Sequence, residues 1–188
     1  MRVVIRGIGV LLVLAAIGSP VLARGVSEVD FLAEFEQALG ERGFTAEEAA
    51  AIAEAARSLD WSDGRRADPG VVADAVARSR DEGSNLKPDK QALLAQKLAE
   101  SSVRLRVEGY EPSDVSVATV EAVSVLRDQI NDWKASGSEE ELGQIVRTTV
   151  ASVARETARA QEQERAGNRG ETARDQAPVG DTPGRPGR

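Results

Sequence analysis

The chain contains no cysteine and no histidine among its 188 residues. Disulfides, thiol nucleophiles and Ser-His-Asp triads are therefore excluded, as are the usual zinc and copper sites. The remaining inventory permits carboxylate chemistry, calcium binding and recognition through the backbone. No residue stands out as catalytic, and we expect neither a cofactor nor a resident metal.

Basic residues are also too few to balance the acids. The chain has 24 Lys and Arg against 31 Asp and Glu, which gives a formal charge of −7. An acidic surface repels the phosphate backbone of nucleic acids, and the sequence shows no basic patch at helical or loop spacing. The same charge opposes resting on an anionic membrane. We therefore expect no nucleic-acid partner.

The N-terminal residues 1–23 resemble an export signal in charge and hydropathy. Arg2 and Arg6 precede an apolar run over 8–17, and small side chains follow at Val21 and Ala23. This order is typical of a cleaved signal peptide of the Sec type. The protein is thus predicted to be exported, to the periplasm or the medium.

Cleavage is predicted after Ala23, so that the mature chain begins at Arg24. Loss of Arg2 and Arg6 would take the formal charge from −7 to −9. After cleavage we expect no stable membrane insertion. The alternative is an uncleaved membrane anchor, because residues 7–23 approach the roughly 20 apolar residues that span a bilayer.

Start and stop signals of helices recur along the rest of the chain, and no alternating run indicates a strand. Thr45 and Glu48 form a capping box, while Pro88 and Pro112 suit the first position of a helix. The fold is therefore predicted to be all-α, a compact bundle of about six helices. The predicted helices cover 27–39, 45–59, 68–80, 88–109, 112–135 and 138–160.

Composition divides the chain after the predicted signal into two parts. Residues 24–160 form the acidic helical domain, whereas 161–188 lack aromatics and are rich in Gly, Pro and Arg. Such a composition buries too little apolar surface to fold, so the tail is predicted to be disordered, or frayed helix followed by coil.

Two predicted helices have apolar faces that suggest particular roles. The helix over 112–135 has a broad apolar arc, which indicates a central helix contacted on two sides. The helix over 138–160 has a stripe that includes Leu142, Val146 and Val150. This spacing is typical of a bundle or coiled-coil seam. It favours packing in the core, with self-association through this helix as the alternative.

A shift of 66 residues aligns two parts of the chain. Leu39, Gly43 and Phe44 fall on Leu105, Gly109 and Tyr110. Each copy has a helix, a glycine stop, an aromatic residue and a second helix. We interpret 32–59 and 98–126 as two related helical hairpins. Alternatively, alanine-rich helices with glycine stops align without common descent.

Trp61 is the candidate contact residue for a partner, together with Arg65 and Arg66. It lies in a polar loop, and only six residues of the chain are aromatic. An exposed indole beside two guanidinium groups could stack on a peptide or a sugar. The alternative is that Trp61 folds over the end of the preceding helix and covers its alanine-rich face.

The acidic residues of the same loop do not follow a calcium-binding pattern. An EF-hand loop requires glycine at its sixth position and glutamate at its twelfth. Counted from Asp60, Gly64 falls at the fifth position and Val71 at the twelfth. Paired acids elsewhere, such as Glu47 and Glu48, lie in the first turns of helices, where the helix dipole favours them. No metal site is therefore predicted.

These features favour an exported, non-enzymatic helical protein that binds a protein or peptide, as an adaptor or chaperone-like factor of the cell envelope. One alternative is a glycosidase-like envelope hydrolase that uses carboxylates alone, with a half-buried acid in a cleft near Trp61. Another is a structural spacer.

Overall fold

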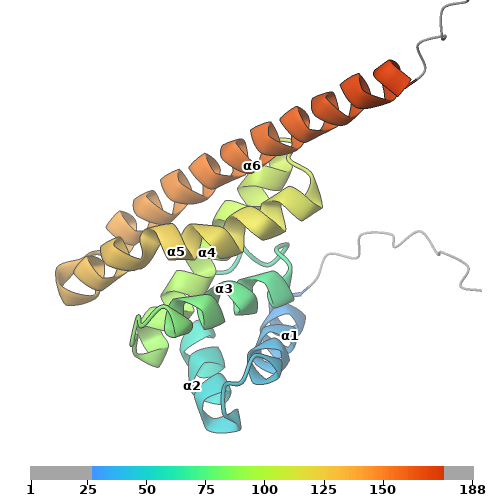
Figure 1. Ribbon diagram of the computed structural model, residues 1–188. Helices are drawn as coiled ribbons and strands as arrows, with labels where there is room; N and C mark the ends of the chain where they lie inside the picture. The colour runs from blue at the N-terminus through green and yellow to red at the C-terminus, as the bar shows by residue number, and fades with distance from the viewer. Residues whose placement is uncertain (1–26, 176–188) are drawn as a thin grey trace, which may run out of the picture.

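The computed structural model describes residues 27–175, which form an all-α bundle, as the sequence predicted (Figure 1). No strand occurs within these residues, and none of their helices has the length and apolar character needed to cross a bilayer. The helices are α1 (Glu28–Glu41), α2 (Ala46–Ala56), α3 (Pro69–Asp81), α4 (Pro88–Val107), α5 (Pro112–Ser136) and α6 (Glu139–Asp175). The predicted signal, with Val21, Ala23 and Arg24, lies outside the described residues.

The helix starts follow the capping residues of the sequence. Thr45 Oγ1 accepts a hydrogen bond from the backbone N–H of Glu48, whose carboxylate accepts one in turn from the N–H of Thr45. Asp68 accepts from the N–H groups of Gly70 and Val71 at the start of α3. Because these bonds satisfy donors that lack partners within the helix, they fix where each helix begins.

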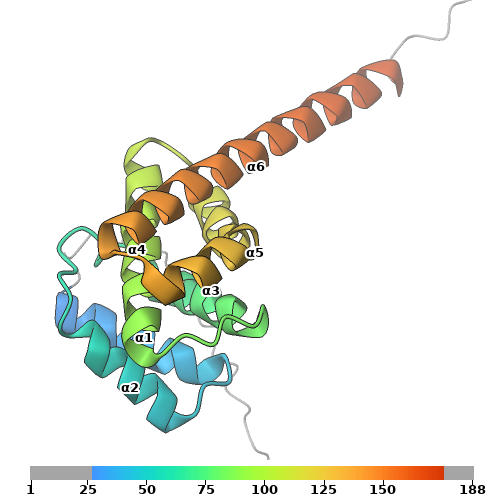
Figure 2. The same ribbon diagram turned by 90° about the vertical axis from the view of Figure 1, so that its left-hand side faces the viewer.

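The core consists of two apolar clusters with α3 and α4 between them. The first cluster joins α1, α2 and the loop after α2, and the second joins α5 and α6. Figures 1 and 2 show α1 and α2 at one end of the molecule and α5 and α6 at the other. Two sets of side chains on α4 divide between the clusters, Ala92, Ala95 and Ala99 facing the first and Leu94, Leu98 and Leu105 the second.

The helix predicted over 112–135 is contacted on more than one side, as its broad arc indicated, and α4 has the same character and contributes to both clusters. Helix α4 contacts α2, α3, α5 and α6, whereas α5 contacts α3, α4 and α6. Part of the broad arc of α5 stays in solvent, because Val117 and Val125 are exposed. The alanines of α4 form a second packing face because small side chains let neighbouring elements approach closely.

The stripe of α6 is a seam of the core. Leu142, Val146 and Val150 are fully buried against α4 and α5. These side chains are not free to contact a second copy, so the predicted self-association would have to use another surface.

Helix α6 continues well beyond the predicted end of the helical domain. It has 37 residues, which corresponds to about 55 Å, and its far end projects from the bundle in Figure 1. The tail predicted to start at Gln161 is thus helical as far as Asp175, and residues 176–188 lie outside the described residues. Gln161 Nε2 donates a hydrogen bond of 2.6 Å to buried Asp114 on α5, so α6 is attached to the bundle up to this residue.

The corners of the two aligned hairpins have the same local geometry. Gly43 and Gly109 both have positive φ, and the N–H groups of Phe44 and Tyr110 donate to the carbonyl oxygens of Leu39 and Leu105. These are Schellman-type helix ends. The corner after α3 at Gly83 has the same bond, so this geometry is common to three corners. The duplication stays a prediction.

The corner between α5 and α6 generates a prediction about stability. A Cβ on Gly137 would lie 1.8 Å from Cδ1 of Trp133, whose ring is buried and donates to the carbonyl oxygen of Ser138. Gly137→Ala is therefore expected to lower the free energy of unfolding by about 1–3 kcal/mol, measured by urea denaturation.

Gly40 provides the matched control, since a Cβ there meets no atom within 4 Å and the residue lies inside α1. Gly40→Ala should raise the free energy of unfolding by about 0.5–1 kcal/mol. A Gly137→Ala protein as stable as the parent would contradict the described packing of Trp133.

Candidate functional site on the outer face of α4

Trp61 belongs to the core, so the expectation of an exposed stacking surface was wrong. Its side chain is 0% exposed, and its ring centroid lies 4.9 Å from that of Phe31 and 6.3 Å from that of Phe35. The indole N–H donates to the carbonyl oxygen of Ala56 at the end of α2, which satisfies the polar atom of the ring. Trp61 therefore covers the end of α2, as the alternative interpretation held.

The two arginines predicted beside Trp61 differ in their surroundings. Both are exposed, but Arg66 lines the first of two pockets described below, whereas Arg65 lines neither. Arg65 continues the loop, where its N–H donates to the carbonyl oxygen of Trp61. The loop therefore contributes Arg66 to a possible contact surface, and it leaves the indole inside the protein.

A pair of valines on the last turns of α4 forms the most distinctive surface feature near this loop. Val103 and Val107 are four residues apart and so lie on the same side of the helix. Val107 is 82% exposed, although its side chain is apolar. We call this pair the valine ridge. It lies between two pockets, because both valines line each of them.

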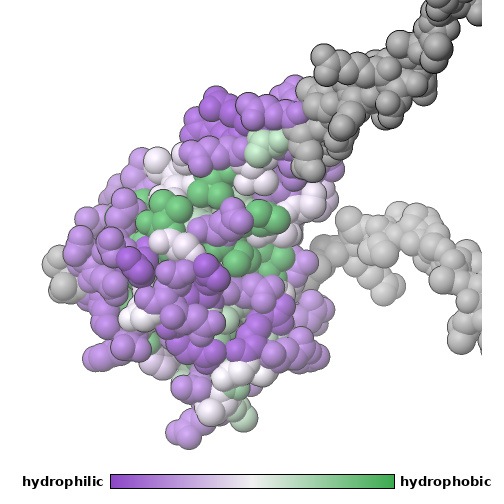
Figure 3. Space-filling view, viewed as in Figure 1, coloured by the Kyte–Doolittle hydropathy of each residue, from purple (hydrophilic) through white to green (hydrophobic). Residues whose placement is uncertain are grey.

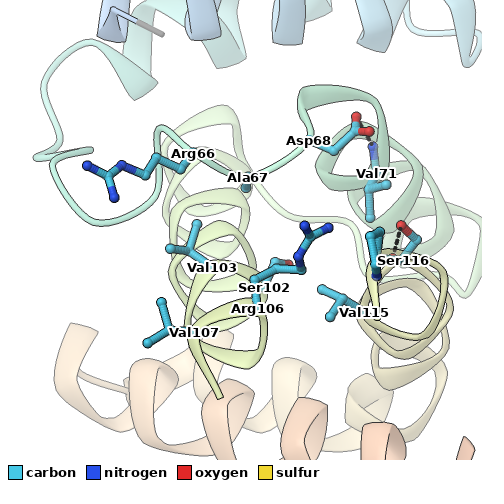
Figure 4. Close-up of a pocket in the computed structure, with 11 residues that line it drawn as sticks. Arg66, Ala67, Asp68, Val71, Ser102, Val103, Arg106, Val107, Val115 and Ser116 are labelled. Atoms are coloured by element: carbon cyan, nitrogen blue, oxygen red, sulfur yellow. Dashed lines mark hydrogen bonds between the residues drawn. The ribbon is translucent and has the colours of Figure 1, made fainter. Parts of the chain in front are cut away.

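The first pocket is formed by the start of α3, the end of α4 and the start of α5, and it has a volume of about 380 Å³ (Figure 4). In Figure 4 the side chain of Arg106 rises over the middle of the pocket, whereas Arg66 lies at its edge and points outward. The other lining residues are Ala67, Asp68, Val71, Ser102, Val103, Val107, Pro112, Val115 and Ser116.

Hydroxyl groups in the first pocket have partners within the protein. Ser102 Oγ lies 2.8 Å from Thr119 Oγ1 and donates to the carbonyl oxygen of Leu98. Ser116 Oγ donates to the carbonyl oxygen of Pro112. Because these hydrogen bonds are made internally, the wall of the pocket presents mainly its apolar atoms to a ligand.

The second pocket lies on the other side of the valine ridge and has a volume of about 430 Å³. Helix α4 and the first turns of α6 supply most of its wall, and its lining is more polar. Besides the two valines, the lining residues are Asp63, Lys97, Glu100, Ser101, Arg104, Gly143 and Arg147.

Glu100 in this pocket is a half-buried acid, with a side chain that is 30% exposed. Burial raises the pKa of Glu100, and Asp63 and Glu139 raise it further, while Lys97 at 3.4 Å opposes the shift. Burial lowers the pKa of a lysine, but the attraction of Glu139 and Glu100 outweighs this effect, so the pKa of Lys97 is raised. Lys97 thus connects α4 to the start of α6 through Glu139, 3.0 Å away.

Glu100 also lies close to the loop that contains Trp61. A Cβ on Gly64 would be 3.1 Å from Cβ of Ala99 and 3.6 Å from the backbone nitrogen of Glu100, so the loop packs directly on α4. The half-buried acid near Trp61 that a carboxylate hydrolase would require is therefore present. Within residues 27–175 no group of three acids converges in a way that could hold a metal ion.

A further apolar area lies over α5 in the middle of the face shown in Figure 3. Val117 and Val125 are the exposed large hydrophobic residues of this helix. Neither of them lines either of the two pockets beside the valine ridge. The valine ridge differs because it combines an exposed apolar side chain with a concave surface on both sides.

Sequence reasoning named Arg66 but missed the valine ridge. Val103 and Val107 are single apolar residues near the end of a helix, and the pocket walls come from segments over 30 residues apart in the chain. Neither residue differs in type from the valines of the core. One feature of the sequence could have indicated that Val107 is exposed, namely its position between two charged residues, Arg106 and Glu108.

The raised pKa of Glu100 predicts how stability depends on pH. The folded state disfavours ionised Glu100, so Glu100→Gln should raise the melting temperature at pH 7. The gain should vanish below the ordinary glutamate pKa of 4.5, where Glu100 is protonated in both the folded and the unfolded state. Thermal unfolding across this pH range tests the expectation.

Glu82 is the matched control because its environment has the opposite effect. A hydrogen bond from Ser124 Oγ, with Arg78 and Arg127, lowers the pKa of Glu82. Ionised Glu82 stabilises the folded state, so Glu82→Gln should lower the melting temperature at pH 7, with the loss fading as the pH falls through the lowered pKa. Shifts of the same sign in both variants would refute this assignment of charges.

No protein-family model, curated protein or solved structure matches this chain. Its function has to be inferred from its own residues and surface.

Proposed function

We propose that this is an exported, non-enzymatic protein that binds a polypeptide segment, as an adaptor or chaperone-like factor of the cell envelope. The observation that carries the proposal is the valine ridge, where Val107 is 82% exposed between two pockets. Residues 1–23, read as a Sec-type signal, support the site of action.

The shape of the surface suits side chains of a partner. A single exposed valine is ordinary on a soluble protein, because much of any protein surface is apolar. A ridge with a concave pocket on each side is different, since the first pocket, with its mainly apolar wall, can take a large apolar side chain, and the second, with its more polar lining, can take a polar one. Burying a large apolar side chain contributes about 1.5–3 kcal/mol, which is a useful part of a binding free energy.

The chemical inventory agrees with a binding role. Histidine and cysteine, which carry much of the acid–base and nucleophilic chemistry of enzymes, are absent from the chain. A peptide-binding protein needs neither of them, because apolar pockets and a few polar groups suffice for recognition.

Site-specific crosslinking tests the proposal. A photoreactive amino acid at Val107 should give a discrete adduct with another polypeptide in native cells, because this position lies at the centre of the proposed contact. Val29 is the matched control on α1, since it is also an exposed valine, at 77%. Val125 on α5, which is 63% exposed, is a second control of the same kind.

An adduct from Val107 that is absent from Val29 and Val125 supports the proposal. When added as a competitor in this crosslinking experiment, the Val107→Asp protein should reduce the adduct less than the parent protein does. Because the side chain is exposed, this substitution should leave the melting temperature almost unchanged. No adduct from Val107, or an equal yield from all three positions, would refute the proposed surface.

A second candidate function is a glycosidase-like hydrolase, and the half-buried Glu100 favours it. A general acid needs a raised pKa, and burial gives Glu100 such a shift beside Asp63. If this candidate is correct, purified protein should cleave cell-wall glycan, and Glu100→Gln should abolish the cleavage. Glu108→Gln on the same helix is the control that should stay active, because Glu108 is exposed and pairs with Arg104.

A further inference from the structure

Four arginines surround the valine ridge of this acidic protein. Arg66 and Arg106 line the first pocket, and Arg104 and Arg147 line the second. All four are exposed. The chain as a whole has a formal charge of −7, so this concentration of positive charge around an apolar ridge is opposite in sign to the net charge.

Three of these arginines lack an ion-pair partner within the described part of the chain. Arg104 pairs with Glu108 at 3.0 Å, whereas no described carboxylate lies within 4.0 Å of Arg66, Arg106 or Arg147. Their guanidinium groups can therefore pair with carboxylates of a ligand without breaking an ion pair that the described structure contains.

Two of the three acids that line these pockets make contacts within the protein, whereas the third, Asp63 in the wall of the second pocket, is exposed. Asp68, in the wall of the first pocket, accepts hydrogen bonds from the N–H groups of Gly70 and Val71 and so caps α3. Glu100, in the wall of the second, is paired with Lys97. Arg66, Arg106 and Arg147 are thus available to carboxylates of a bound segment, with Asp63 as the exposed acid of the lining that opposes them.

On this basis we propose that the valine ridge binds an acidic polypeptide segment of a partner protein, with an apolar side chain for the first pocket and carboxylates that meet Arg66, Arg106 and Arg147. The inference rests on the proposed function and adds the chemistry of the partner. Complementary charge at the rim of an interface raises the rate of association and makes binding depend on salt.

The shape and charge of the surface favour a polypeptide over the two other occupants. A lipid bilayer would not fill a pair of concave pockets, and an anionic bilayer would repel a protein of this net charge. A second copy of the chain offers the exposed valines Val29, Val117 and Val125, and of these only Val29 stands between two acidic residues.

A displayed library of random peptides provides the test, with the full mature protein as bait. Selected peptides should be enriched in Asp and Glu next to apolar residues, relative to the unselected library. Individual binders should weaken as ionic strength rises, because salt screens exposed charges. Each of Arg66→Gln, Arg106→Gln and Arg147→Gln should weaken binding roughly two- to five-fold, as is typical of exposed ion pairs.

Arg159→Gln is the matched control, since Arg159 is exposed on α6 and lines neither pocket. It should leave binding unchanged, and Val107→Asp should abolish it. All four arginines replaced here, the control included, are exposed, so we expect their replacement to leave the melting temperature unchanged. Measuring it checks that each variant folds.

The outcomes separate this inference from the proposed function. If neutral or basic peptides bind and Val107→Asp abolishes their binding, the inference of an acidic partner is wrong, although the valine ridge is still a binding surface. A library that yields no binder, together with no adduct from Val107 in cells, would overturn both. Cosedimentation with phosphatidylglycerol vesicles, or a concentration-dependent dimer lost with Val107→Asp, would also overturn the acidic partner.

Discussion

The two-sided burial of α4 is the constraint on which the rest of the structure depends. One face presents alanines to α2 and the Trp61 loop, and the other presents leucines to α5 and α6. Small side chains let the loop approach closely at Gly64, while large ones fill the wider gap to the other helices. Together with α3, which also contributes side chains to both, α4 thereby joins the two apolar clusters.

The candidate site follows from this arrangement. Because the middle of α4 is largely buried, the helix reaches solvent mainly at its two ends, and the valine ridge lies at the C-terminal one. Gly109 ends the helix and Pro112 starts α5, so the first turn of α5 stands beside the valine ridge and forms a wall of the first pocket. The start of α6, fixed to α4 through Lys97 and Glu139, stands beside the second pocket. The fold thus holds both sides of the site on packed helices, which favours a preformed binding surface.

Sequence predicted the helices well because their ends are chemical signals within a few residues of each other. Thr45 with Glu48, Pro88 and Pro112 start helices where expected. The end of α6 was placed too early, since the polar residues after 160 are compatible with a projecting helix as well as with coil.

Other features depend on contacts between distant segments, which local patterns do not contain. The polar neighbours of Trp61 suggested exposure, yet the backbone carbonyl of Ala56 satisfies the indole N–H and lets the ring enter the core. The alanines of α4 resembled helix formers in the sequence, and only the packing shows that they are a second face. The valine ridge has no sequence pattern of its own, because three helices and a loop combine to make its surroundings.

Native-state hydrogen exchange tests the central role of α4 most directly. If α4 joins both clusters, the amides of Ala95 and Leu98 should be among the slowest to exchange, with the same opening free energy as the slowest amides of α2 and α5. Equal opening energies would show that both halves unfold together with α4. The contrary result is that the amides of α5 and α6 exchange slowly, whereas those of α1, α2 and α4 open at a much lower free energy. That result would contradict a central role for α4.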